Sequence, residues 1–144
     1  MMTIEEVKEL VLTLGKKIGI KEDYKLYPMF AKFSNVFSEG SSVYVDESAY
    51  HFVAMERGKV VEQYESEDVN DILYQVFAEI TSFMASNYEV KHRKEDEDPR
   101  RGCWKEELRL LKMINPMFVE MRLEEINMIL KNYPFKDGKG KDLL

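Results

Sequence analysis

Cysteine, histidine and long apolar runs are scarce in this chain of 144 residues. Its one cysteine, Cys103, has no second cysteine to pair with, which excludes an internal disulfide and suits a reducing compartment. No stretch approaches the roughly 18 consecutive apolar residues of a membrane-spanning helix. The first ten residues mix Glu5, Glu6 and Lys8 with apolar side chains, unlike the basic start and apolar core of a signal peptide. We therefore expect a cytoplasmic protein without a membrane segment.

An excess of positive charge is also missing. The 21 Lys and Arg residues are outnumbered by 27 Asp and Glu residues, so the formal net charge is -6. Such a chain repels a phosphate backbone, whereas nucleic-acid-binding domains carry a basic stripe. The composition therefore disfavours a nucleic-acid ligand and permits a basic protein partner.

The residues that usually carry catalysis or bind metals are few. His51 and His92 are the only histidines, and neither stands at a metal-ligand spacing from Cys103 or from the other. The glycines within residues 138–141 follow no predicted strand and precede no predicted helix, so they do not form a phosphate-binding loop. A Gly-x-Ser-x-Gly motif is absent. We therefore expect no catalytic residues, no metal and no cofactor, which leaves binding as the function.

The N-terminal half predicts one helix followed by three strands. Thr3 and Glu6 have the spacing of a capping box, and apolar residues recur at helical intervals from residue 4 to residue 18. Residues 21–40 lack a clear period, so we expect an irregular crossing there. Between residues 42 and 64 the apolar period becomes two, which predicts three short antiparallel strands. Gly58 can take the positive φ of a tight turn between the last two strands.

The C-terminal half predicts three helices. Ser66 followed by two acidic residues is a favourable helix start, and an apolar stripe continues from Val69 to about Arg93. Asp98-Pro99 and Asn115-Pro116 each combine a cap with a first-turn proline, so two more helices should begin there.

The order of these elements predicts an α+β fold, in which a small antiparallel sheet of about three strands packs against about four helices. We expect one face of the sheet to be exposed to water. Residues 1–135 should form a single domain, and residues 136–144 a flexible C-terminal tail.

A charged cluster stands out where the first of the three C-terminal helices should end and the second should begin. It consists of Glu89, His92, Arg93, Asp98, Arg100 and Arg101. Two arginines in the first turn of a helix oppose its macrodipole, so acidic groups should compensate them. In a structural interpretation, Glu89 and Asp98 pair with the arginines across the loop and hold two helices together. In a binding interpretation, His92 and the arginines hold an anion or a partner, since arginine binds carboxylate and phosphate in a fixed geometry. The other histidine, His51, fits a packing role.

Several segments along the chain resemble one family in their order and spacing. They are Leu26-Tyr27-Pro28, Tyr50-His51-Phe52-Val53, Glu56-Arg57-Gly58, Asp71 to Phe77, Phe83-Met84-Ala85, Tyr88 to Arg93, Asp98 to Arg101 and Tyr133-Pro134-Phe135. On these segments the chain resembles the bacterial immunity protein family 63. The resemblance implies a component of a polymorphic toxin system that binds and neutralises a cognate toxin, and it implies no enzyme.

The charge of the chain suggests the character of such a toxin. Opposite net charges speed the encounter of two proteins, so an acidic immunity protein suits a basic toxin. The densest acidic patch beside an aromatic residue is our candidate for toxin contact; it consists of Glu62, Tyr64, Glu65, Glu67 and Asp68. One alternative is a small ligand-binding regulator or enzyme that uses the histidine and arginines of the charged cluster on an anionic metabolite. Another is a homo-oligomeric adaptor with an adaptable surface rich in Met and Tyr.

Overall fold

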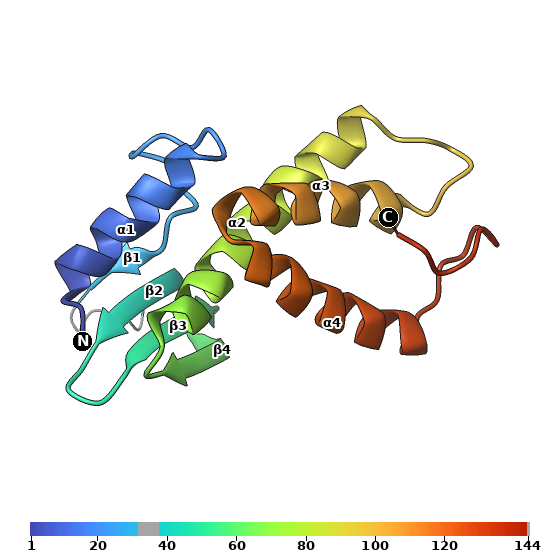
Figure 1. The fold of residues 1–144 in the computed structure, drawn as a ribbon. Helices are drawn as coiled ribbons and strands as arrows, with labels where there is room; N and C mark the ends of the chain where they lie inside the picture. The colour runs from blue at the N-terminus through green and yellow to red at the C-terminus, as the bar shows by residue number, and fades with distance from the viewer. Residues whose placement is uncertain (32–37, 144) are drawn as a thin grey trace. The chain divides into compact units, whose positions relative to one another are not determined.

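The computed structural model describes residues 1–31 and 38–143 (Figure 1). The described residues form four helices and one four-stranded sheet, which confirms the predicted α+β class. In chain order the elements are α1 (Ile4–Lys16), β1 (Met29–Phe30), β2 (Gly40–Val45), β3 (Tyr50–Glu56), β4 (Lys59–Ser66), α2 (Val69–Lys91), α3 (Pro99–Ile114) and α4 (Pro116–Asn132). The chain divides into two compact units, Met1–Phe77 and Ala78–Leu144, and residues of α2 belong to both.

The first unit begins with α1, whose N-terminus has the predicted capping box. The Thr3 hydroxyl oxygen accepts the backbone N–H of Glu6 at 3.2 Å, and the Glu6 carboxylate accepts the backbone N–H of Thr3 at 3.5 Å. Val7 and Val11, one helical turn apart, are fully buried. The helix contacts β1 and β2, so its apolar stripe contributes to the core of this unit.

The sheet has the strand order β1-β2-β3-β4 (Figure 1). β2 pairs antiparallel with β3, and β3 with β4; these are the three strands that the period of two predicts. β1 lies within residues 21–40 and pairs parallel with β2, so the sheet is four-stranded and mixed rather than three-stranded and antiparallel. A strand of two residues is too short to show an alternating pattern, which explains the difference. Residues 32–37, also in this stretch, lie outside the described residues.

A two-residue turn joins β3 to β4. Arg57 and Gly58 have φ angles of 53° and 77°, and a type I′ turn requires positive φ at both central positions. The flanking residues Glu56 and Lys59 lie opposite each other. The predicted turn is therefore confirmed, with Arg57 sharing the left-handed conformation expected of Gly58.

A β-bulge interrupts the pairing of β4 with β3. Met55 lies opposite Val60, but the preceding residue of β3, Ala54, lies opposite Glu62. Val61 is therefore an extra residue in β4. Beyond it the register is regular to the end of the strand.

β3 is buried on both faces of the sheet, contrary to the expectation that one face is exposed to water. Phe52 is 1% exposed, and Val53, which points to the opposite face, is 2% exposed. On the Val53 face, Ala31 packs against a cluster of Tyr44, Val53 and Met55. The nearly continuous apolar run of β3 is typical of a strand covered on both sides. The exposed part of the sheet is instead β4, which is open to solvent over almost its whole length.

In the second unit, α3 and α4 begin at the predicted caps. The Asp98 side chain accepts the backbone N–H of Arg100, and the Asn115 side chain accepts that of Met117, both at 3.0 Å. A proline follows each cap at the first helical position, where its missing N–H would have no helical partner anyway. These local signals suffice to place both helix starts.

The second unit has an apolar core to which the C-terminal segment contributes. Its buried members are Trp104, Leu108, Ile126, Leu130 and Leu143, with Phe135 packed against them. Residues 133–143 therefore return to α3 and α4, although they form no regular secondary structure. The flexibility of residues 136–144 and the single domain over residues 1–135 stay predictions, and any motion of the tail has to release the buried Leu143.

Candidate functional site

The charged cluster predicted from the sequence lies in the second unit, around the end of α2 and the start of α3. Arg93, two residues beyond α2, forms a bidentate pair with Glu89 in the last turn of that helix: Arg93 Nε donates to Glu89 Oε1 at 2.8 Å, and Nη2 donates to Oε2 at 2.9 Å. The hydrogen bonds from Arg93 lower the pKa of Glu89. Each carboxylate oxygen of Glu89 thus accepts one hydrogen bond from the Arg93 guanidinium.

His92 is held by the same turn of helix. Its Nδ1 lies 2.9 Å from the backbone carbonyl oxygen of Tyr88, and its ring stacks on the Tyr88 ring with 4.0 Å between centroids. These two contacts fix the imidazole on its own helix.

Arg100 closes onto the cap of α3 and onto the chain after α4. Its Nε and Nη2 donate to the two carboxylate oxygens of Asp98 at 3.1 and 2.9 Å. Its Nη1 and Nη2 also donate to the backbone carbonyls of Tyr133 at 2.7 Å and Pro134 at 2.9 Å. The pKa of Asp98 is lowered to about 2, first by the Arg100 side chain and further by the backbone N–H groups of Arg100 and Lys136.

The Arg101 side chain, like that of Arg100, donates four hydrogen bonds. Its Nε and Nη2 donate to the carboxylate of Asp137 at 2.7 and 2.9 Å, and both side chains are only 6% exposed. It also donates to the backbone carbonyls of Gly140 at 2.6 Å and Asp142 at 3.0 Å. The guanidinium carbon lies 3.9 Å from the centroid of the Phe135 ring. The C-terminal segment therefore wraps around this one side chain.

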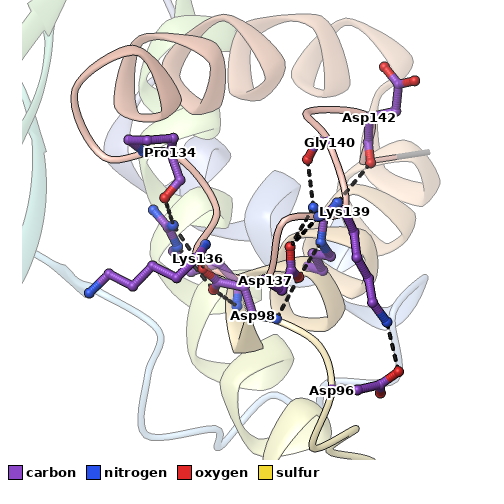
Figure 2. A network of polar contacts seen from close by, with 10 residues as sticks. Asp96, Asp98, Pro134, Lys136, Asp137, Lys139, Gly140 and Asp142 are labelled. Atoms are coloured by element: carbon purple, nitrogen blue, oxygen red, sulfur yellow. Dashed lines mark hydrogen bonds and ion pairs between the residues drawn. The ribbon is translucent and has the colours of Figure 1, made fainter.

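Asp137, which the sequence analysis does not single out, completes this network (Figure 2). Its carboxylate accepts the backbone N–H of Asp98 at 2.7 Å and of Lys139 at 3.1 Å. The hydrogen bonds from Arg101, and then those from the backbone, hold the pKa of Asp137 well below its usual range. Asp137 lies 36 residues beyond Arg101, in a segment rich in Lys and Gly, so no local pattern announces the pair.

These pairs agree in part with the structural interpretation: Glu89 and Asp98 each pair with an arginine of the cluster, but neither pair joins α2 to α3. Arg93 and Arg100 pair with carboxylates close to them in the chain, whereas Arg101 pairs with the C-terminal segment. The arginines at the start of α3 therefore bind the chain end rather than α2. The binding interpretation requires cations that are available to an anion, and each of these side chains is engaged internally. A structural role for the cluster stays a prediction that the geometry favours.

A cavity of about 290 Å³ lies beside the cluster, between the end of α2 and α3. Its volume is near the lower limit for small-molecule sites. Its acidic lining residues are Glu89, Glu97, Asp98 and Glu106, and its Lys and Arg residues are Arg93, Lys94, Lys105 and Arg109. Since the two signs are balanced, the cavity offers no net attraction to an anionic metabolite.

The candidate toxin-contact patch lies on β4 and on the chain leading into α2, in the first unit. Glu62 and Tyr64 lie on the face of the sheet that carries Phe52, whereas Glu65 lies on the other face, opposite His51. The structure therefore does not gather all five residues on one face. Three of them lie on β4, and the other two lie between β4 and α2.

The last two residues of the patch stand at the start of α2. Asp68 Oδ1 accepts the backbone N–H of Asn70 at 2.9 Å, so this carboxylate serves as a helix cap. Glu67 beside it is exposed.

Apolar side chains on β4 are exposed next to this patch. Val60, Val61 and Tyr64 are 46%, 49% and 40% exposed. The sequence pattern predicts the two valines as ordinary strand residues, because a period of two does not distinguish an edge strand from a covered one. They add apolar surface to a patch predicted from charge alone.

His51 lies on the face of β3 away from Phe52 and is buried. Its Nε2 lies 2.8 Å from Asp46 Oδ2, its Nδ1 lies 3.7 Å from Glu65 Oε2, and its ring stacks on Tyr44 with 4.3 Å between centroids. Backbone N–H groups that follow Asp46 lower the pKa of that carboxyl. This environment is that of a packed histidine with polar partners.

Among residues 1–31 and 38–143, no three His, Cys, Asp or Glu side chains gather as a metal ion would require. Over the same ranges, no helix is both long and apolar enough to cross a lipid bilayer.

The family model described as Immunity protein 63 matches residues 46–128, which is more than half of the chain. No curated protein matches the chain, and no solved structure does. The matched region contains β3, β4, α2 and α3 in full, and with them both the charged cluster and the β4 patch.

Proposed function

The chain belongs to the Immunity protein 63 family, and from this premise we propose that it is an immunity protein that binds a cognate bacterial toxin and neutralises it. It acts in the cytoplasm of the cell that it protects. It works by binding alone, without an enzymatic step.

The observation that carries this proposal is the family match over residues 46–128. The matched region includes β4, the most exposed strand of the sheet, and the acidic residues around it. The internal pairing of the arginines in the charged cluster gives the competing metabolite-binding function no support.

The toxin that fits this surface is basic. From Glu56 to Asp71, both included, the chain has six acidic residues and two basic ones, and all eight are exposed. Complementary charge raises the rate of encounter and disfavours wrong partners. A basic toxin, such as a nuclease, therefore meets its inhibitor most readily over β4.

Co-expression tests the proposal. The chain is expressed in a bacterial host together with the toxin domain encoded beside its gene, and growth and co-purification are both scored. Rescue of growth with a stable complex is the expected result. Growth arrest without a complex would contradict the proposed function.

Two controls make the result specific. A toxin from a different family should still arrest growth in the presence of the chain, because an immunity protein recognises its own toxin. A Phe52→Asp variant, which places a charge at a fully buried position, should lose the rescue together with the fold.

A further inference from the structure

Among the described residues, β4 is an edge strand that pairs with β3 alone. Seven of its eight residues, Lys59 to Glu65, are exposed. An open edge presents unpaired backbone N–H and C=O groups, which can accept another strand. Proteins usually block such an edge with proline, lysine or a bulge. β4 has no proline, and its one lysine and its bulge lie near the turn, so the stretch from Glu62 to Ser66 is unblocked.

The register identifies the backbone groups that point outward. Glu56 and Lys59 flank the two-residue turn and therefore form a hydrogen-bonded pair, so the backbone of Glu56 faces β4. Along the regular strand β3 every second residue does the same, which includes Phe52. The backbone groups of the odd-numbered residues of β3 face β2 instead. A hydrogen bond just beyond this pair of strands has the same phase: the Asp46 N–H donates to the carbonyl oxygen of the odd-numbered Ala49 at 3.1 Å.

The pairing of β4 follows from this alternation. Tyr64 lies opposite Phe52, so the Tyr64 backbone bonds to β3. Gln63 and Glu65 lie opposite the residues of β3 that face β2. Their N–H and C=O groups therefore point away from the sheet, at the spacing that an added strand requires.

We infer that a basic, extended segment of the toxin adds to β4 as a further strand of the sheet. This inference rests on the proposed function and names its binding mode. Main-chain hydrogen bonds to Gln63 and Glu65 supply affinity, and side chains of the segment contact the alternating side chains of β4. Lysine or arginine opposite Glu62 and Glu65 gives favourable cross-strand pairs, and Tyr64 offers an exposed aromatic surface.

Charge disfavours a second copy of the chain as the occupant of this edge. An added strand must place outward-pointing residues opposite each other, so antiparallel self-pairing is centred on a residue such as Gln63 or Tyr64. Pairing centred on Tyr64 places Glu65 of each copy diagonally across from Glu65 of the other, and pairing centred on Gln63 does the same for Glu62. Like charges at these positions repel each other. Each chain also carries a net charge of -6, so two copies repel. A basic partner reverses both effects.

Amide exchange in the complex tests the geometry directly. Exchange of individual amide protons is measured by NMR for the free chain and for the chain bound to an inactive variant of the toxin. The Gln63 and Glu65 amides should exchange rapidly when free and become protected in the complex, whereas the Tyr64 amide should be protected in both states. Unchanged exchange at Gln63 and Glu65 in a stable complex would overturn the inference and leave the proposed function standing.

Two matched substitutions test the energetics. Gln63→Pro removes an outward N–H that β3 does not use, and edge strands tolerate such a proline; Gln63→Ala removes the side chain but keeps that N–H. The proline variant should bind the toxin at least about 30-fold more weakly, the loss typical of an interface anchor, while the alanine variant stays within about 3-fold. Circular dichroism and thermal unfolding establish that both fold. Equal affinities of two folded variants would refute strand addition.

Charge reversal tests the nature of the segment. Glu62→Lys should slow association and weaken its dependence on salt; Glu9→Lys, an equivalent change on the exposed face of α1, should leave association close to that of the parent. Equal effects of the two changes would contradict a basic segment at β4. A chain that sediments as a dimer, and as a monomer after Gln63→Pro, would instead assign the edge to a second copy. Failure of the parent chain to bind any toxin would refute the proposed function itself.

Discussion

Replacing Glu107 by Gln or by Ala should change the stability of the protein by very different amounts. Glu107 is 1% exposed in α3, and its Oε1 pairs with Arg122 Nε of α4. Its other carboxylate oxygen is buried, with no hydrogen-bond partner among the described residues. Burial raises the pKa of Glu107 although Arg122 opposes the change, so desolvation outweighs the attraction of the pair.

The raised pKa of Glu107 determines whether Glu107→Gln raises or lowers the free energy of unfolding. The folded state favours the protonated acid, so the stability that this preference contributes is present at low pH and is lost as the pH rises through the raised pKa. Glutamine has the shape of the protonated acid and can still accept from Arg122. At pH 7 the free energy of unfolding of this variant should therefore equal or exceed that of the parent, within about 1 kcal/mol.

Glu107→Ala removes the acceptor and leaves space beside Arg122. Breaking a buried pair in this way costs about 3 to 5 kcal/mol. The Arg122 side chain is 16% exposed and its Nη1 lies 3.6 Å from a carboxylate oxygen of Glu125, so a loss near about 3 kcal/mol is expected. Glu106→Ala, which breaks a pair with the largely exposed Arg109, should cost less than about 1 kcal/mol and serves as the control.

Urea denaturation at pH 5 and pH 7 measures these differences. The stability of the parent relative to Glu107→Gln should be lower at pH 7 than at pH 5. If the glutamine variant loses as much stability as the alanine variant at pH 7, desolvation does not dominate at Glu107 and the reasoning is wrong.

Three further predictions concern the ends of helices. Because the pKa of Asp98 is lowered to about 2, stability should decline as the pH falls below the usual value of 3.8. Thermal unfolding of Asp98→Asn, which keeps a cap, should show a smaller decline than the parent over this pH range. Arg101→Gln should speed amide exchange in residues 137–143, whereas unchanged exchange would show that these contacts do not hold the segment. Thr3→Ala should lower the free energy of unfolding by about 1 kcal/mol, and a change near zero by urea denaturation would count against the capping box.

Features encoded by neighbouring residues could be predicted from the sequence. Thr3, Asp98 and Asn115 lie at caps because each cap bonds to a backbone N–H two or three residues on, within the reach of a sequence pattern. The turn at Gly58 has the same local origin. The three antiparallel strands follow from the period of two, whereas the two residues of β1 are too few to show one.

Features that depend on distant residues could not be predicted. The partner of Arg101 is Asp137, and only the folded chain brings the two together. The charge pattern predicts which residues form the charged cluster but not which arginine pairs with which carboxylate. In β4, no sequence pattern indicates that Val60 and Val61 stay exposed, because an apolar residue in an edge strand has the same pattern as one in a covered strand.

Titration of the purified toxin with the purified chain tests the central claim most directly. The toxin activity is measured at a concentration well above the dissociation constant while the chain is added in increments. A linear loss of activity that is complete at an equimolar ratio is the predicted result, with Phe52→Asp giving no inhibition. Full toxin activity in the presence of an excess of folded chain would contradict the assignment of this protein as its immunity partner.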